Sequence, residues 1–214
     1  MPHPKEDRIL VYEKGTLLPL SGKELNAADG LCYRKRFING RIVERFMPTG
    51  LKETSAIIVI SSEVVESAAN TFTDLKVDLQ LNPLDQEVFV VYGIDLDVVD
   101  PTLVPGTTTA INLSLSTTQR TNVGGMENSN VLANNRIQIQ SAGGEVVRGA
   151  YASDSAPGTQ LEYVGIIATN DFYLNIIGSN NTLARFGKAR VYGVRAKASS
   201  AIYAALVQSE LLSA

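Results

Sequence analysis

Few residues in this chain could carry out side-chain catalysis or hold a metal. The 214 residues include one histidine, His3, and one cysteine, Cys32. His3 lies between two prolines in a polar N-terminal stretch, so no core fixes it beside Cys32 as a nucleophile and base require. Cys/His zinc spacing, a Gly-x-Ser-x-Gly elbow and a phosphate-binding loop are also absent. We therefore expect no cofactor, no metal site and no enzymatic activity.

Carboxylates are the remaining groups that could do chemistry unaided. Asp95 and Asp97 alternate with apolar residues, so a strand would place both on one face, about 7 Å apart. Such a pair could hydrolyse a glycosidic bond, and together with Asp100 it could bind a cation such as calcium. We favour an exposed strand that ends in a loop, because no glycine-containing loop with ligand spacing follows. The absence of tryptophan also argues against a sugar-binding cleft.

Basic side chains gather in one short segment. Tyr33–Ile38 and Arg41–Phe46 flank Asn39-Gly40, the pair that a type I′ hairpin turn favours. The hairpin carries five basic residues that are candidates for nucleic-acid or inter-subunit contact: Arg34, Lys35, Arg36, Arg41 and Arg45. Residues 1–54 hold 10 basic and 7 acidic side chains, whereas residues 55–214 hold 9 and 15. The alternative is a solvated hairpin face, because the tract is short and the chain as a whole carries a net charge of −3.

The elements that would position these residues are strands. Apolar and polar residues alternate with period two in segments separated by turn signals every 8–12 residues. The clearest segments are 76–81, 87–99, 111–116, 136–140, 161–168, 172–177 and 188–197. Gly93 and Gly193 lie where the alternation changes phase, which predicts β-bulges. The pattern predicts an all-β, antiparallel β-sandwich with about eight strands in two sheets.

Two segments stay open between alternatives. Ser61–Asn70 could be a short helix with a serine cap, or a loop. Ser199–Leu212 could be a helix or a last strand. We expect residues 1–54 to form an extended N-terminal arm with the hairpin, and residues 55–214 to form the sandwich. A long polar loop is expected over residues 117–135.

Composition bears on partners and location. Charged residues make up 19% of the chain, below the usual quarter, as in proteins that bury surface between copies. A single cysteine allows no intrachain disulfide. The N-terminus lacks the apolar region of a secretory signal, and no apolar run is long enough to span a membrane. We expect a soluble protein made in a cytosol.

The arm with its basic hairpin, the strand-rich body over residues 71–207 and the polar loops at 102–110, 117–135 and 178–187 together resemble one family. The layout resembles that of single jelly-roll capsid (coat) proteins of icosahedral viruses, over roughly three quarters of the chain. The resemblance implies a jelly-roll sandwich and self-assembly into a shell. It further implies an arm that orders against neighbouring subunits or the genome, and a location in the virion, assembled in the host cytoplasm.

Other functions fit parts of the same pattern. A head-decoration or tail protein would share most of these features and differ in assembly geometry. A jelly-roll carbohydrate-binding module would share the fold, and a hydrolase would depend on Asp95 or Asp97. Under the coat-protein hypothesis the partners are copies of the chain itself, other virion proteins and, through the basic hairpin, weakly the genome.

Overall fold

The computed structural model describes residues 10–13, 16–19, 34–38, 41–45, 47–152 and 163–212, and for residues 10–45, Ala152 and Leu211 it describes the backbone alone. The chain divides into two compact units, Met1–Thr49 and Gly50–Ala214. The sequence-based division at residue 54 assigned residues 51–53 to the arm. In the structure these residues form a strand that pairs within the second unit.

The described residues of the first unit form two small antiparallel hairpins. β1 (Leu10–Glu13) pairs with β2 (Thr16–Pro19), and β3 (Arg34–Ile38) pairs with β4 (Arg41–Arg45). Ile38 and Arg41 are paired across the two-residue connection. The hairpin predicted around Asn39-Gly40 is therefore confirmed.

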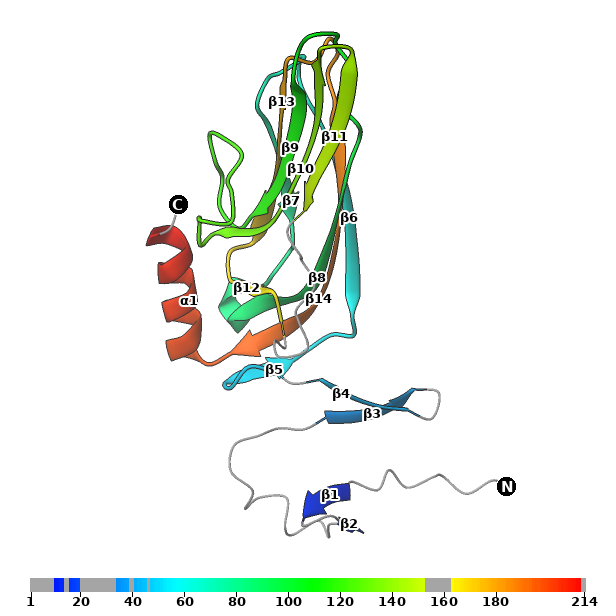
Figure 1. The fold of residues 1–214 in the computed structure, drawn as a ribbon. Coiled ribbons are helices and arrows are strands. Elements are labelled where there is room, and N and C mark those ends of the chain that lie inside the picture. Colours follow the sequence, from blue (N-terminus) through cyan, green and yellow to red (C-terminus); the bar gives the residue numbers. More distant parts are fainter. Residues whose placement is uncertain are drawn as a thin grey trace, which may run out of the picture. The chain divides into compact units, whose positions relative to one another are not determined.

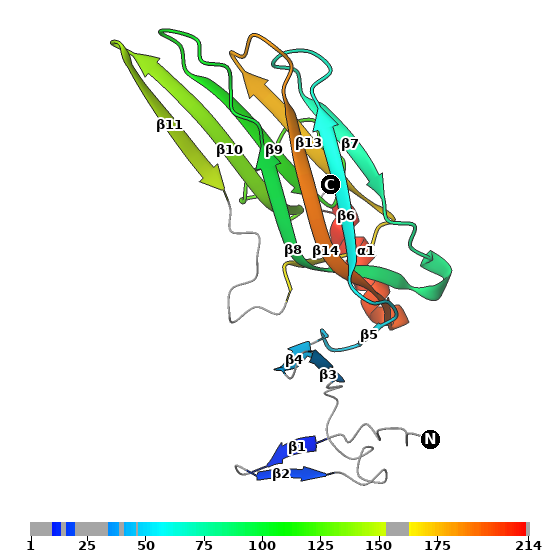
Figure 2. The same ribbon diagram turned by 90° about the vertical axis from the view of Figure 1, so that its right-hand side faces the viewer.

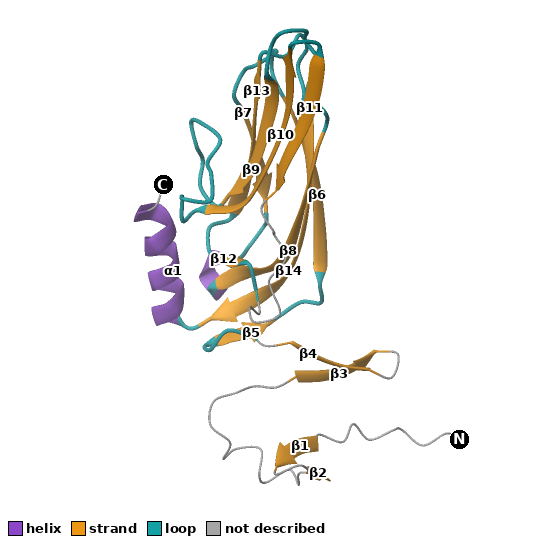
Figure 3. Cartoon of the chain, in the orientation of Figure 1, coloured by secondary structure: helices purple, strands orange, loops and turns teal. Residues whose placement is uncertain are grey.

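The second unit is built almost entirely from strands (Figure 3). Its described part contains ten: β5 (Leu51–Glu53), β6 (Ile58–Val65), β7 (Thr73–Asp78), β8 (Glu87–Val98), β9 (Thr109–Ser116), β10 (Val131–Ala142), β11 (Glu145–Ala152), β12 (Gly165–Ile167), β13 (Asp171–Ser179) and β14 (Phe186–Ala198). A 3₁₀ turn, η2 (Pro83–Asp85), precedes β8, and the helix α1 (Ser200–Leu212) follows β14.

The strands form two antiparallel sheets that face each other (Figures 1 and 2). One has the order β12-β8-β14, with β6 and β5 both paired to the far side of β14, and the other has the order β11-β10-β9-β13-β7. From β6 to β14, each connection crosses to the opposite sheet except in the β9-β10-β11 meander. This crossing pattern confirms the predicted fold class, an antiparallel β-sandwich of jelly-roll type.

The core lies between the two sheets, as alternation requires. Phe89, Ile111, Leu113, Phe172 and Leu174 are at most 1% exposed, and they belong to one continuous apolar cluster. In β8, Val88–Val91 are buried without interruption, so both faces of that stretch are covered. No metal or disulfide is needed to explain a core of this size.

The two predicted bulges meet at one irregularity. Along the β8–β14 ladder, Tyr192 pairs with Gly93 whereas Gly193 pairs with Val91, so Tyr92 is an extra residue on β8. A Cβ atom on Gly193 would lie 2.5 Å from the carbonyl oxygen of Val90. Glycine is therefore required where the two strands approach this closely.

Both interpretations of Ser61–Asn70 were wrong for its first half. Residues 61–65 continue β6, where Ile58, Ile60 and Val64 turn inward and Val59 and Val65 outward. Ser61 and Glu63, which resembled the start of a capped helix, occupy alternating outward positions on the strand instead, and Glu66 follows its end. Residues 66–70 form bends and turns. Pairing with β14 outweighs the local helix signal because it completes the sheet.

The tail is a helix, which settles the second open segment. The backbone N–H of Tyr203 donates to the carbonyl of Ser199 at 2.9 Å, and Ile202 lies against Gly50.

The sheet β11-β10-β9-β13-β7 departs from expectation in two places. β10 begins at Val131, so the predicted polar loop ends at residue 130, and β11 is a strand that the sequence analysis did not identify.

Candidate functional site

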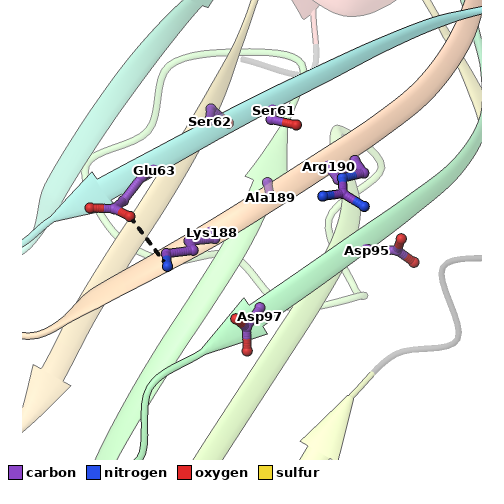
Figure 4. A pocket seen from close by; sticks show the side chains of 8 residues that line it. All are labelled: Ser61, Ser62, Glu63, Asp95, Asp97, Lys188, Ala189 and Arg190. Carbon is purple, nitrogen blue, oxygen red and sulfur yellow. Dashed lines mark ion pairs between the residues drawn. The ribbon is translucent and has the colours of Figure 1, made fainter.

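Asp95 and Asp97 lie on the solvent-facing side of β8, as their alternation predicted. Both side chains are exposed, while Ile94 and Val98 are buried in the core. They line a hollow of about 500 Å³ on the outer face of the sheet, which crosses the neighbouring strands β14 and β6 (Figure 4). The other lining residues are Ser61, Ser62, Glu63, Lys188, Ala189 and Arg190.

Charges of opposite sign alternate across this hollow. The register places Lys188 of β14 directly between Asp97 of β8 and Glu63 of β6, and its Nζ lies 3.6 Å from Glu63 Oε2. In the next outward-facing row, Arg190 pairs with Asp95. Cross-strand pairs of this kind stabilise a sheet face modestly.

Tyr192 of β14 links Arg190 of that strand to Asp95 of β8. Its hydroxyl donates to Asp95 Oδ2 at 2.8 Å. Hydrogen bonding to Tyr192, with a smaller contribution from Asp95, raises the pKa of Arg190 above its ordinary value. Each aspartate therefore lies beside a cation or a hydrogen-bond donor rather than beside a second unpaired acid.

This arrangement suits a charged surface better than metal chemistry. Among the described residues, no group of three or more histidine, cysteine, aspartate or glutamate side chains could hold a metal ion. A calcium site needs six to eight oxygen ligands, and the register partners of Asp97 and Asp95 are the cations Lys188 and Arg190. The cation site considered for Asp95 and Asp97 thus has no support in this geometry.

The five predicted basic residues lie on β3 and β4, and the register divides them. Directly opposed residues in an antiparallel pair share a face, and successive residues alternate faces. Arg34 is opposite Arg45, and Ile38 is opposite Arg41. Arg36 is on the same face as Arg34, two positions along. Four arginines therefore occupy one face of the ribbon.

Lys35 falls on the other face of the hairpin. Its register partner is Glu44, so this position pairs a cation with an anion. The structure thus brings together four of the five predicted residues and separates Lys35 from them. His3 and Cys32 lie outside the described residues.

Exposed apolar side chains form a surface feature that the sequence analysis missed. Val146, Val147 and Tyr151 of β11 are each more than half exposed. Leu84, Leu183 and Leu212 are exposed on η2, on the loop before β14 and at the end of α1. The sequence signal for β11 was the pair Val146-Val147, which follows Gly143-Gly144 and precedes a polar stretch after Ala152. It was missed because two adjacent valines do not show the alternating pattern of a half-buried strand.

Two buried carboxylates hold the ends of the sandwich in place. Glu66 accepts backbone N–H groups from Gly178 and Arg185. Glu210 of α1 accepts those of Ala168 and Thr169, both at 2.9 Å. Burial raises the pKa of Glu210, although the two backbone hydrogen bonds partly oppose the shift. Both acids have structural partners, which accounts for their burial.

Comparisons with protein-family models and with curated proteins find no match. Among solved structures, a chain of Desmodium yellow mottle tymovirus is similar over 72% of this chain and 93% of that chain, with 9% sequence identity and a TM-score of 0.28. The assignment of the jelly-roll fold rests on the strand order itself. No helix in the described part of the chain has the length and apolar character needed to cross a membrane.

Proposed function

We propose that this chain is a structural protein of a virus, a coat subunit that assembles with copies of itself into the virion shell. The observation that carries the proposal is the set of large apolar side chains left exposed on a well-packed jelly-roll sandwich. They occur on the outer strands β6 and β11, on the turns near Leu84 and Leu183, and at the end of α1.

Several contact surfaces are what a shell subunit needs. A closed shell requires each subunit to meet neighbours on several sides, whereas a simple dimer needs one surface. Large apolar groups exposed in separate places, on a chain with only 19% charged residues, fit contacts that are completed by other copies. The core requires no cofactor, and the proposal includes no catalytic activity.

The basic hairpin supplies the second part of the proposal. Arg34, Arg36, Arg41 and Arg45 share one face of β3–β4 in register. Like charges placed opposite each other destabilise a strand pair, and phosphate groups relieve that repulsion. We assign to this face a weak, sequence-independent contact with the genome inside the virion. Assembly would take place in the host cytoplasm, with other virion proteins as further partners.

Assembly of the full chain tests the proposal. Purified protein should be examined by electron microscopy and analytical ultracentrifugation over a range of protein and salt concentrations. Closed particles of uniform size are expected, formed by the chain alone or after addition of nucleic acid. A monomer that persists at every concentration, with and without nucleic acid, would exclude the coat-subunit role.

Further experiments on the same purified protein distinguish the coat subunit from the alternative functions. Binding only to preformed shells would indicate a decoration protein, and tubes would indicate a tail component. Specific retention on a glycan array, with no assembly, would indicate a carbohydrate-binding module. Hydrolysis of a glycan that is lost in Asp95→Asn/Asp97→Asn would support the carboxylate enzyme instead.

A further inference from the structure

β11 forms an open edge of its sheet. It pairs with β10 along all eight residues and is the last strand in the sheet order. Among the described residues, no strand pairs with its outer side. Exposed strand edges present unpaired N–H and C=O groups that can bind another strand.

This edge lacks the features that usually protect one. Val146 is 54% exposed on one face of β11, and Val147 and Tyr151 are 58% and 57% exposed on the other. The strand contains no proline or lysine, and its one internal cation, Arg148, is paired with Asp100, two residues beyond the end of β8, at 2.6 Å. At the opposite edge of the same sheet, β7 carries Asp74, Lys76 and Asp78 instead.

The turn before β11 determines which backbone groups point outward. Gly143 and Gly144 both have positive φ, 60° and 85°, as in a type I′ turn. The flanking pair Ala142–Glu145 is then the first hydrogen-bonded pair of the hairpin. The odd-numbered residues of β11 therefore bond to β10, and the even-numbered residues direct their N–H and C=O groups to the open edge.

A second copy of β11 fits this edge about a twofold axis. Two antiparallel registers overlap by seven residues. The register centred on Arg148 would place two cations opposite each other, which is unfavourable. The register centred on Gly149 opposes Val147 to Tyr151 twice, sets glycine against glycine, and places each Arg148 opposite an alanine.

The Gly149 register also satisfies the hydrogen bonding. In this register the hydrogen-bonded pairs are 146↔152 and 148↔150. These are the even-numbered residues, whose backbone N–H and C=O groups point to the open edge. The apolar pairs Val147↔Tyr151 fall in the non-bonded positions, where side chains approach most closely. The Arg148 register also pairs even-numbered residues with each other, as 146↔150, so backbone pairing permits both registers and the side-chain contacts select the one centred on Gly149.

We propose that two copies of this chain pair through β11, antiparallel about Gly149, and join their two five-stranded sheets into one continuous sheet. The occupant of the edge is a second copy because, in this register, the apolar residues Val147 and Tyr151 complement each other and no like charges are opposed. This inference deepens the proposed function by naming one contact of the assembly. It rests on that function only in requiring that the chain associate with itself.

Cysteine cross-linking tests the register. In a Cys32→Ser background, Val147→Cys/Tyr151→Cys should give a covalent dimer under mild oxidation, because opposed non-bonded residues lie within disulfide range. Within one chain the two cysteines would be about 13 Å apart along the strand, too far to react with each other. The dimer should form at concentrations below those needed for particles.

A matched control uses the other register. Val146→Cys/Ala150→Cys in the same background aligns only if the axis passes through Arg148, so no cross-linked dimer is expected. Equal cross-linking of both variants, or of the control alone, would overturn the inference. So would the absence of a dimer from the first variant when circular dichroism shows it folded.

Failure of this inference is distinguishable from failure of the proposed function. Uniform shells in the electron microscope without a 147–151 cross-link would remove the β11 contact and leave the coat role intact. A 147–151 dimer that never forms larger particles would support the β11 contact and remove the coat role.

Discussion

Oε1 of Glu66 accepts a hydrogen bond from the backbone N–H of Gly178 at 2.6 Å, between residues that are 112 positions apart in the chain. The second carboxylate oxygen accepts from the N–H of Arg185 at 2.8 Å, and the side chain is 3% exposed. One acid at the end of β6 thus anchors both ends of the β13–β14 connection.

Removing this carboxylate should destabilise the fold. Glu66→Ala leaves one buried and one partly buried N–H group without acceptors, and we expect a loss of about 2–4 kcal/mol in the free energy of unfolding. Urea denaturation followed by circular dichroism measures the change. Glu63→Ala, on the same strand with an exposed ion pair to Lys188, is the control and should change stability by less than about 1 kcal/mol. Equal losses in both variants would contradict the anchoring role.

Alanine substitution should affect stability differently at the two glycines of the bulge. Gly193→Ala should destabilise by about 1–3 kcal/mol, because the new methyl group meets the Val90 backbone oxygen at 2.5 Å. Gly93→Ala should be nearly neutral, because its nearest atom is Tyr192 Cδ2 at 3.8 Å. Thermal unfolding of the two variants tests this difference. A larger loss of stability in Gly93→Ala than in Gly193→Ala would contradict the close approach of the two strands at Gly193.

Glu210 should make the attachment of α1 depend on pH. Its pKa is raised above 4.5 by burial, so the folded state holds a proton that the unfolded state releases. The stabilisation is fully present below about pH 4.5 and is lost as the pH rises through the raised pKa. The backbone N–H groups of Ala168 and Thr169 and the side chain of Thr169 lower this pKa, and the carboxylate of Asp171 raises it further.

Comparison with Glu210→Gln isolates this effect, because other titrating groups are common to both proteins. The stability of the wild-type chain relative to Glu210→Gln should fall as the pH rises from below 4.5, then level off. Urea titrations at a series of pH values provide the measurement. A relative stability that increases with pH would show that the backbone hydrogen bonds outweigh burial.

The hairpin register predicts different effects for adjacent basic residues. Arg36→Glu should weaken nucleic-acid binding by the full chain and reduce its salt dependence, because Arg36 shares a face with three other arginines. Lys35→Glu makes the same change of net charge on the face that also holds Glu44, and should weaken binding less. Fluorescence anisotropy at several salt concentrations measures both. Indistinguishable variants would mean that net charge alone governs binding.

Local patterns in the sequence were sufficient for most strands and for the fold class. The alternation around Asp95 and Asp97 predicted correctly which face of β8 each residue takes, because the side-chain period of a strand is fixed at two. Gly93 and Gly193 marked the bulge for the same reason. β11 was missed because exposure of both faces of an edge strand leaves no alternating pattern to recognise.

Long-range pairing decided the rest. The sequence by itself determined that the chain is β-rich, that Asn39-Gly40 closes a basic hairpin and that the usual catalytic side chains are nearly absent. Only the tertiary structure placed Lys188 between Asp97 and Glu63 and left β11 at an open edge. Those outcomes depend on register and strand order, which arise from contacts between residues far apart in the chain and are not encoded in any local window.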